Sequence, residues 1–321
     1  MRFRVRRTFS FVAPLVVLMT FSSISGDDLL SPDAKLEKVV GDLKFSEGPA
    51  WHPDGYLLFE DIPRNRILRL EAGDKVSVFR EPSSHSNGLA FDKEGRLIAA
   101  EGNSSDGGRR ISRTENDGRV VTLAERYNGK RLNSPNDLTI DDQGRIYFTD
   151  PRYGSQDGVE QDRESVYRID PDGKLTRIID SVSRPNGIAI SPDQKTLYVA
   201  DNREGGVNRV LMGFDLAPDG NASNGLVLYD FGSGRGIDGM ALDSCGRIWA
   251  TAGSKEKAGV HVFELDAQRM SAKLLHVIAT PEDPTNCTFG GASRDTLFIT
   301  TATSLYRIRT TAKGIATLPG K

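Results

Sequence analysis

Short apolar runs alternate with turn-forming residues along most of the 321-residue chain, and the pattern repeats about every 50 residues. Helical periodicity is weak throughout. The unit that begins at Asn136 shows the arrangement most clearly, because turns or a loop separate four runs of apolar and β-branched residues. These runs are residues 138–140, 145–149, 165–169 and 175–179, with turns at 141–144 and 170–173. The pattern predicts four short strands in each repeat.

A polar residue with an oxygen-bearing side chain stands directly before the first strand of five repeats. The five segments are Glu47–Trp51, Asn87–Phe91, Asn136–Ile140, Asn186–Ile190 and Asp238–Leu242. Successive leading residues are 40, 49, 50 and 52 positions apart. Equivalent positions in successive repeats face the same direction, so repeats arranged around an axis would bring these side chains together. A ring of carboxylate and amide oxygens suits a hard cation such as calcium.

The repeat predicts an all-β fold, a six-bladed β-propeller with four-stranded antiparallel blades. A sixth, degenerate unit has strands at residues 296–300 and 304–308 but lacks an outer strand. We expect Leu36–Val40 to supply that strand, which would join the chain ends and remove an exposed sheet edge. A sandwich of two domains is the alternative. In a propeller the first strand of each blade lines the central channel, which places the leading polar residues at its mouth.

The N-terminal residues differ in character from the rest of the chain. Residues 1–7 are largely cationic, residues 9–21 are mostly apolar and residues 23–26 are small, which is the layout of a secretory signal. The apolar run of about 13 residues is shorter than the roughly 20 that span a bilayer, so a retained anchor is the weaker interpretation. We expect residues 1–26 to be a signal peptide and residues 27–321 a single propeller domain, exported to the periplasm or the extracellular space. The paired arginines also fit a twin-arginine signal, so the export route stays open.

Composition and charge narrow the classes of function. The net charge is −2 and acidic and basic residues are mixed along the chain, so nucleic acid is not an expected partner. Cys245 and Cys287 are the only cysteines; unpaired thiols are the default, a disulfide is the alternative, and a zinc site lacks support. The chain has no Gly-x-Ser-x-Gly elbow, His-Glu-x-x-His helix or phosphate-binding glycine motif. Serine-nucleophile, zinc-protease and nucleotide chemistry therefore lack support as well.

Several motifs follow one another in the order and spacing of a known family. They are Ser46–Trp51, Ser134–Leu138, Tyr147–Gly154, Pro185–Ala189, Asp238–Met240 and Cys287–Gly291, and they extend over essentially all of the mature chain. In these motifs the chain resembles the SMP-30/gluconolactonase family of six-bladed propellers, and its bacterial gluconolactonase members in particular. The resemblance implies a metal-dependent lactonase, a carboxylic ester hydrolase that opens a sugar lactone such as gluconolactone.

The resemblance also implies a set of metal ligands. In the family a divalent cation, commonly calcium, is held in the channel by side chains that correspond to Glu47, Asn136, Asn186 and Asp238. Two carboxylates and two amide oxygens leave calcium with open positions for water and substrate, since about six to eight ligands are usual. A lactone carbonyl polarised there would be attacked by water, with Asp238 as the general base. Zinc, manganese and magnesium are the alternative cations.

Other residues are candidates for the substrate pocket. Asn87 is the repeat position outside the family's ligand set, and we expect it to face substrate or a metal-bound water. Animal members of the family hold a sugar hydroxyl with an arginine where this chain has Ser134. Arg152 is one possible substitute for that arginine. The substrate-binding set that we expect is Asn87, Arg131, Tyr153 and His85.

Further acidic residues leave alternatives open. Asp137 is the runner-up for the general base, although strand alternation would turn it away from the channel. The sixth repeat, at residues 286–288, offers no matching ligand. Acids also recur near the end of the second strand in four repeats, either as loop caps or as an outer ring around a cation or substrate. These acids are Asp61, Glu101, Asp150 and Asp201.

Two other functions fit the same sequence. The same metal site could act on an organophosphate, an acyl-homoserine lactone or another ester. Outside the enzymes, the alternative is a non-catalytic propeller that binds a small ligand or a protein and uses the cation only for structure. In the leading interpretation the partner is a small-molecule lactone, no stable membrane span is expected, and a monomer is the default.

Overall fold

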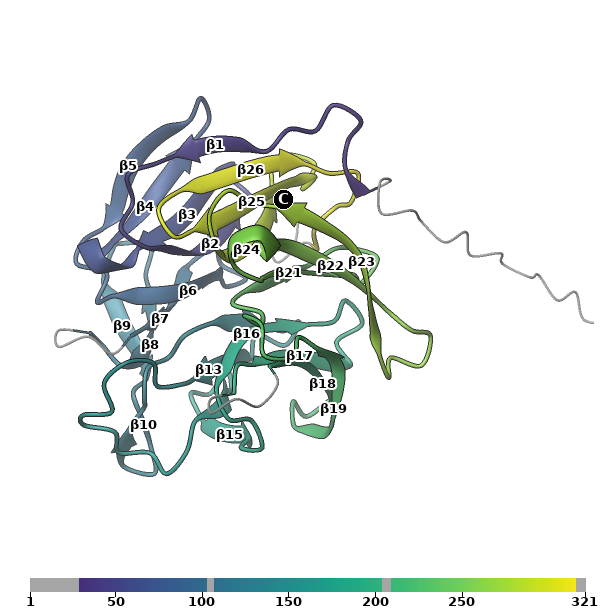
Figure 1. Ribbon diagram of the computed structural model, residues 1–321. Coiled ribbons are helices and arrows are strands. Elements are labelled where there is room, and N and C mark those ends of the chain that lie inside the picture. Colours follow the sequence, from purple (N-terminus) through teal and green to yellow (C-terminus); the bar gives the residue numbers. More distant parts are fainter. Residues whose placement is uncertain (1–28, 103–106, 204–208, 316–321) are drawn as a thin grey trace, which may run out of the picture.

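The four-strand repeat forms six antiparallel sheets that follow one another in chain order (Figure 1). The structure is a computed structural model and describes residues 29–102, 107–203 and 209–315. The predicted six-bladed β-propeller is confirmed, and the two-domain sandwich is wrong. The expected signal peptide, residues 1–26, lies outside the described residues. Within the described ranges no helix has the length and apolar character that a membrane span requires.

Each of the first three blades contains four consecutive strands, and the first of these is the innermost. Blade 1 is β2 (Ser46–His52), β3 (Tyr56–Asp61), β4 (Arg66–Glu71) and β5 (Lys75–Arg80). Blade 2 is β6 (Ser86–Phe91), β7 (Leu97–Glu101), β8 (Arg110–Thr114) and β9 (Val120–Ala124). Blade 3 is β12 (Leu138–Ile140), β13 (Ile146–Asp150), β14 (Ser165–Ile169) and β15 (Leu175–Ile179). A small hairpin of β10 (Arg126–Tyr127) and β11 (Lys130–Arg131) precedes blade 3.

The other three blades keep the same order, except that the last one is completed from the N-terminal side. Blade 4 is β16 (Pro185–Ile190), β17 (Thr196–Asp201), β18 (Val210–Leu216) and β19 (Ala222–Asp230). Blade 5 is β20 (Met240–Leu242), β21 (Ile248–Ala252), β22 (Gly259–Leu265) and β23 (Ala272–Ala279). Blade 6 is β24 (Pro284–Gly290), β25 (Thr296–Thr301), β26 (Leu305–Arg309) and β1 (Glu37–Val40). Two short 3₁₀ helices are η2 (Ile62–Arg64) and η3 (Lys255–Lys257).

The hydrophobic core consists of clusters that lie between consecutive blades. Phe148 of blade 3 shares a cluster with Ile98 of blade 2, and Phe298 of blade 6 shares one with Leu57 of blade 1. The inner strands β2, β6, β12, β16, β20 and β24 are neighbours in that order, and β24 returns to β2. Burial of apolar side chains on both faces of each sheet therefore closes the ring. Both cysteines are free thiols, as the default expectation had it.

The N-terminal strand completes the last blade, as the sequence predicted. β1 pairs antiparallel with β26, so that Glu37 lies opposite Arg307 and Val40 lies opposite Leu305 (Figure 1). The guanidinium of Arg307 also donates a hydrogen bond to the Glu37 carboxylate at 2.9 Å. The outer edge of blade 6 is thereby covered by a strand from the other end of the chain.

A single carboxylate stabilises this closure. Glu282 accepts hydrogen bonds from the hydroxyls of Ser304 at 2.6 Å and Tyr306 at 3.0 Å, from the backbone N–H of Thr303 at 2.8 Å, and from the ammonium of Lys38 at 3.4 Å. Partial burial alone would raise the pKa of Glu282, but these hydrogen bonds lower it to about 2. The ionised carboxylate therefore joins β1 to the turn between β25 and β26.

The variant Glu282→Gln should lose about 2 kcal/mol of folding free energy at pH 7, since hydrogen bonds to a charged group are lost. The folded-state pKa lies below the ordinary value of 4.5, so this stabilisation is complete above that pH and disappears as the pH falls towards 2. Denaturant unfolding at pH 7 and at low pH should show the wild-type and variant proteins converging in acid. Glu256→Gln in the exposed helix η3 is the control. If the difference in unfolding free energy between wild type and variant were the same at both pH values, the charge of Glu282 would not be responsible for it.

Candidate functional site

The leading polar residue of every repeat lies at the same place in its blade, at or just before the start of the innermost strand. These residues are Glu47 in β2, Asn87 in β6, Asn136 before β12, Asn186 in β16, Asp238 before β20 and Asn286 in β24. Glu47 lies opposite Glu60 on β3, and Asn286 lies opposite Thr300 at the same place on β25. The sixth blade therefore does continue the polar ring. The position of Asn286, 48 residues after Asp238, is the signal that could have identified it.

Glycine follows the leading residue in four blades because the neighbouring inner strand passes too close for a side chain. A Cβ atom on Gly48, where φ is 56°, would lie 1.9 Å from the carbonyl oxygen of Asn87. A Cβ atom on Gly187 would lie 2.6 Å from the carbonyl oxygen of Asp238, which accepts a hydrogen bond from the Gly187 N–H at 2.7 Å. Ring residues of consecutive blades are therefore held in direct backbone contact.

In blade 3 the position of this glycine is occupied by Asp137, and its side chain is buried in the ring. Its Oδ1 accepts a hydrogen bond from the Leu138 N–H at 2.9 Å, and its Oδ2 accepts one from the Asn286 amide at 3.5 Å. Asn286 also hydrogen-bonds Glu47, so carboxylates from blades 1 and 3 meet at one amide. The expectation that strand alternation turns Asp137 away from the channel is wrong. Regular pairing of β12 begins only at Leu138, so alternation does not yet apply at the preceding residue.

A second group of polar contacts centres on Asp238. The Asn186 Nδ2 donates hydrogen bonds to Asp238 Oδ1 at 2.8 Å and to the Tyr153 hydroxyl at 3.0 Å. Arg235 Nη2 donates to Asp238 Oδ2 at 2.6 Å, which forms an ion pair. The Asp238 side chain is 18% exposed, so it can be reached by solvent. Arg235 was not predicted from the sequence. The only feature that could have identified it is its position three residues before Asp238.

The electrostatics of the ring favour an added positive charge. Burial, together with the charges of Asp238 and Asp137, raises the pKa of Glu47 well above its usual range. Burial also raises the pKa of Asp238, against the opposing effect of the Arg235 guanidinium and the Asn186 amide. Burial raises the pKa of Asp137 to about 7. A cation bound among these groups would stabilise their ionised forms.

The donor atoms of the predicted metal ligands suit a hard cation. In the part of the chain that the structure describes, no three or more His, Cys, Asp or Glu side chains are grouped as a metal site. The predicted set instead joins the carboxylates of Glu47 and Asp238 to the amides of Asn136 and Asn186. Both Nδ2 hydrogens of Asn186 are engaged, so its Oδ1 is the atom able to bind a cation. Oxygen donors of these types are typical of calcium sites.

The acids that recur at the end of the second strand cap the segments that lead into the ring. Asp61, Asp150 and Asp201 are fully buried and accept hydrogen bonds from backbone N–H groups at 2.8–3.0 Å. Those N–H groups belong to Lys44, Ser134 and Arg184, which stand two or three residues before Glu47, Asn136 and Asn186. The loop-capping interpretation is therefore confirmed for these three acids. Glu101 instead accepts hydrogen bonds from side chains, including the Ser112 hydroxyl at 2.6 Å.

The remaining residues predicted to bind substrate lie at different places. Asn87 is half-buried in the ring itself. The Arg131 guanidinium donates a hydrogen bond to the carbonyl of Gly108 at 3.2 Å. His85 Nδ1 lies 2.8 Å from the carbonyl oxygen of Ile62. The roles of Arg131 and His85 in substrate binding stay predictions.

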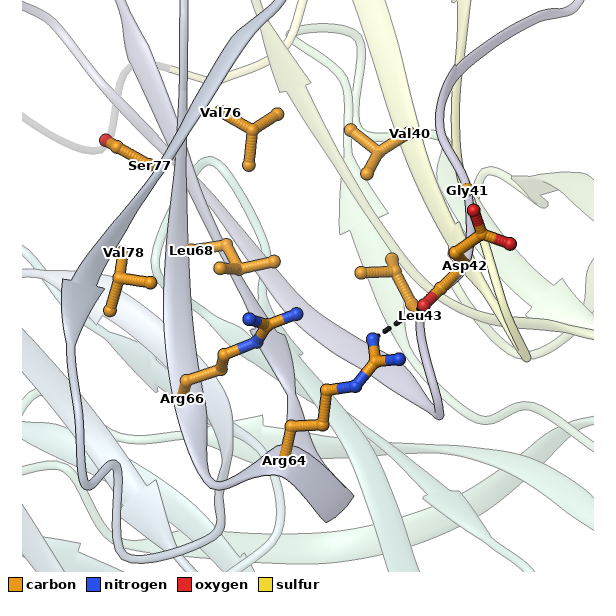
Figure 2. A pocket seen from close by; sticks show the side chains of 10 residues that line it. All are labelled: Val40, Gly41, Asp42, Leu43, Arg64, Arg66, Leu68, Val76, Ser77 and Val78. Atoms are coloured by element: carbon orange, nitrogen blue, oxygen red, sulfur yellow. Dashed lines mark hydrogen bonds between the residues drawn. The ribbon is translucent and has the colours of Figure 1, made fainter.

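A hollow of about 490 Å³ lies at the outer side of the molecule and is separate from the ring. Figure 2 shows that Arg64 and Arg66 extend into it, with Val76 and Val78 on one wall and Asp42 on the other. None of its lining residues belongs to the polar ring. The candidate site is therefore the ring where the inner strands begin, and this hollow is not part of it.

The fold and the ring define the class of protein: a six-bladed propeller with a carboxylate and amide site at its axis. The family described as the SMP-30/Gluconolactonase/LRE-like region matches residues 45–303, and the chain belongs to this family. A gluconolactonase of Zymomonas mobilis is 32% identical over 316 residues, which cover 90% of this chain and 85% of the relative. A pentonolactonase of Haloferax volcanii is 28% identical over 264 residues, or 81% of this chain and 82% of the relative. The solved structure of a gluconolactonase from Xanthomonas campestris is 35% identical with a TM-score of 0.77, covering 88% of this chain and 91% of that one.

Alanine at Gly48 should destabilise the protein more than alanine at Gly144. Both glycines have positive φ, at 56° and 79°, so both variants carry the backbone strain of roughly 1–2 kcal/mol. Only Gly48 faces a backbone atom of the next blade, whereas no atom lies within 4 Å of a Cβ on Gly144. Gly48→Ala should therefore cost about 2 kcal/mol more in the free energy of unfolding, measured with denaturant. Equal losses would mean that the blades can separate at the ring without cost.

Proposed function

We propose that the protein is a metal-dependent lactonase that hydrolyses a sugar lactone such as gluconolactone, with calcium as the cation. The observation that carries the proposal is the meeting of the Glu47 and Asp238 carboxylates with the amide of Asn186 in one buried ring. The gluconolactonase and pentonolactonase relatives support a lactone as the class of substrate. A small-molecule lactone is then the partner of this site.

Glu47, Asn136, Asn186 and Asp238 would hold the cation, since their oxygens fit a hard divalent ion. When bound, the cation supplies Lewis-acid polarisation of the lactone carbonyl. In the described part of the chain, no hydrogen bond engages the Asn136 side chain, which fits a role as a ligand. The carboxylates of Glu47 and Asp238 repel one another in the buried ring, and this repulsion favours the binding of a divalent ion over an empty site.

Asp238 is the proposed general base. Its partial exposure gives water access to the carboxylate. Arg235 and Asn186 each hold one of its two oxygens, which fixes the carboxylate plane and leaves a second lone pair on each oxygen, one to bind the cation and the other to accept the proton of an attacking water. Asp137 is the competing candidate, because its carboxylate lies in the ring and its pKa is raised to about 7 by burial.

The pocket side of the ring would orient the sugar. Asn87 is half-buried in the ring, and the Tyr153 hydroxyl stands beside Asn186. These two polar groups are the proposed contacts to hydroxyls of the lactone. Ser134, in place of the arginine of animal members, would leave room for a substrate that is held differently.

The substitutions Asp238→Asn and Glu47→Gln test the site. Asp238→Asn should lower kcat by about a hundredfold or more, because a positioned base is lost. Glu47→Gln should weaken calcium binding at least tenfold, since one of two carboxylate ligands becomes neutral. Hydrolysis of gluconolactone and of a pentonolactone would be followed at controlled free calcium, and calcium binding by the rise in Tm. Calcium at a hundred times its Kd should stabilise the wild-type protein by about 2.7 kcal/mol.

Asp172→Asn, in an exposed turn of blade 3, is the matched control and should leave both readouts unchanged. If Asp137→Asn abolishes kcat while Asp238→Asn does not, the general base is Asp137. Retention of full activity by both Asp238→Asn and Glu47→Gln would sink the site assignment. A wild-type protein that binds calcium but opens no lactone would leave the non-catalytic propeller as the better description.

We also propose export to the periplasm or the extracellular space, on the basis of the cationic and apolar N-terminal residues alone. Mass spectrometry of the mature N-terminus should find cleavage near residue 26. An intact N-terminus on protein recovered from cells would contradict this proposal.

A further inference from the structure

Two buried arginines, Arg109 and Arg152, connect the loop before the ring residue Asn136 to the loop after β13. Arg109 is 7% exposed and Arg152 is 5% exposed. Arg109 lies near enough to Asp150, the acid that caps the segment leading to Asn136, to interact with its charge, and Arg152 follows Asp150 by two residues. Arg152 was considered above as a substitute sugar-binding arginine, but its burial and its contacts give it a different role.

Each guanidinium reaches backbone carbonyls of both loops. Arg152 donates to the carbonyl of Asn133 at 3.0 Å on one side, and to those of Ser155 at 2.8 Å and Asp157 at 2.5 Å on the other. Arg109 donates to the carbonyl of Leu132 at 2.8 Å on the first side and to that of Gly158 at 3.0 Å on the second. Five charge-assisted hydrogen bonds therefore join residues 132–133 to residues 155–158.

The loop that these bonds hold carries Tyr153. Its hydroxyl accepts the hydrogen bond from Asn186 described above, so the loop after β13 reaches from blade 3 to a ring residue of blade 4. Arg184 lies over the Tyr153 ring with 5.1 Å between the guanidinium carbon and the ring centroid. The position of the Tyr153 hydroxyl thus depends on where residues 151–158 are held.

The position of Arg109 is energetically unfavourable. Burial and the neighbouring charges of Arg131 and Arg152 all disfavour its positive charge. The residue also has a φ of 49°, which costs an L-amino acid backbone energy, and its Nη2 is buried without a hydrogen-bond partner in the described part of the chain. Stability alone does not explain two buried like charges close together, one of which, Arg109, has a strained backbone. Strain of this kind is characteristic of residues that hold a functional site in place.

We propose that Arg109 and Arg152 are positioning residues, which hold the loop of residues 151–158 so that the Tyr153 hydroxyl stays against Asn186 at the substrate side of the ring. The effect on catalysis rests on the proposed lactonase function, whereas the effect on the loop does not. A lysine at either position keeps the charge but not the planar group that reaches several carbonyls at once.

The test compares Arg152→Lys, Arg109→Lys and Tyr153→Phe with each arginine variant combined with Tyr153→Phe. Amide hydrogen exchange of residues 132–134, whose N–H groups are hydrogen-bonded to Glu125 and Asp150 where the two loops meet, should become at least tenfold faster in either lysine variant. In the wild-type background each lysine variant should lower kcat/KM about tenfold. In the Tyr153→Phe background the same substitution should lower kcat/KM less than threefold, because the hydroxyl that the arginines position is already gone. Two different arginine variants protect the test against one that fails to fold.

Arg119→Lys, an exposed arginine in the turn of blade 2, is the control and should change neither exchange nor kcat/KM. Unchanged exchange of residues 132–134 in both lysine variants would overturn the proposal. Equal losses of kcat/KM in the two backgrounds would overturn it as well, since the arginines would then act independently of Tyr153. If the wild-type protein opens no lactone, the lactonase function fails; the loop assignment is then decided by exchange and by whether the Tm losses of Arg152→Lys and Tyr153→Phe are non-additive.

Discussion

The close approach of the inner strands is the constraint on which the rest of the structure depends. Where Gly48 and Gly187 pass the neighbouring blade there is no space for a Cβ atom. This contact sets how near the six blades come to the axis, and therefore how near their leading side chains come to one another. A wider ring would leave the carboxylates and amides as separate surface groups. At this radius they form one buried polar cluster.

Such a cluster is costly, and the architecture offsets the cost elsewhere. Acidic side chains gathered in a buried ring oppose folding, as the raised pKa values of Glu47 and Asp137 indicate. One apolar cluster lies between each pair of consecutive blades, and none of the six clusters contains a leading polar residue. The residues that stabilise the fold and the residues that form the polar ring are therefore different ones. The apolar contacts between blades hold the ring closed, and the axis can keep a polar arrangement that would be unstable by itself.

Most of the fold and part of the site could be predicted from the sequence, for physical reasons that differ. The repeated apolar runs predict the blades because turn-forming residues mark the ends of each strand. Blade 6 lacks an outer strand in its own repeat, and β1 is the strand that can complete it. The polar ring could be predicted because equivalent positions in the repeats face the same direction. This argument identified Glu47 and Asp238. Asp137 was misjudged because regular strand alternation has not begun there. Arg235 and Arg109 act through contacts between segments that are distant in sequence or irregular in conformation, and no periodicity reports such contacts.

The pairing of β1 with β26 gives the molecule a kinetic property as well as a structural one. Glu37 and Arg307 are in contact although they stand 270 positions apart in the sequence. Contacts of this sequence separation form late, because the entropy of closing so long a loop must be overcome first. Before blade 6 forms, the other five blades are an open row of sheets, and the sheet at each end of the row has one uncovered face. The ring is therefore an all-or-none state of the whole polypeptide, and the polar cluster at its axis exists only after the first and last strands have met.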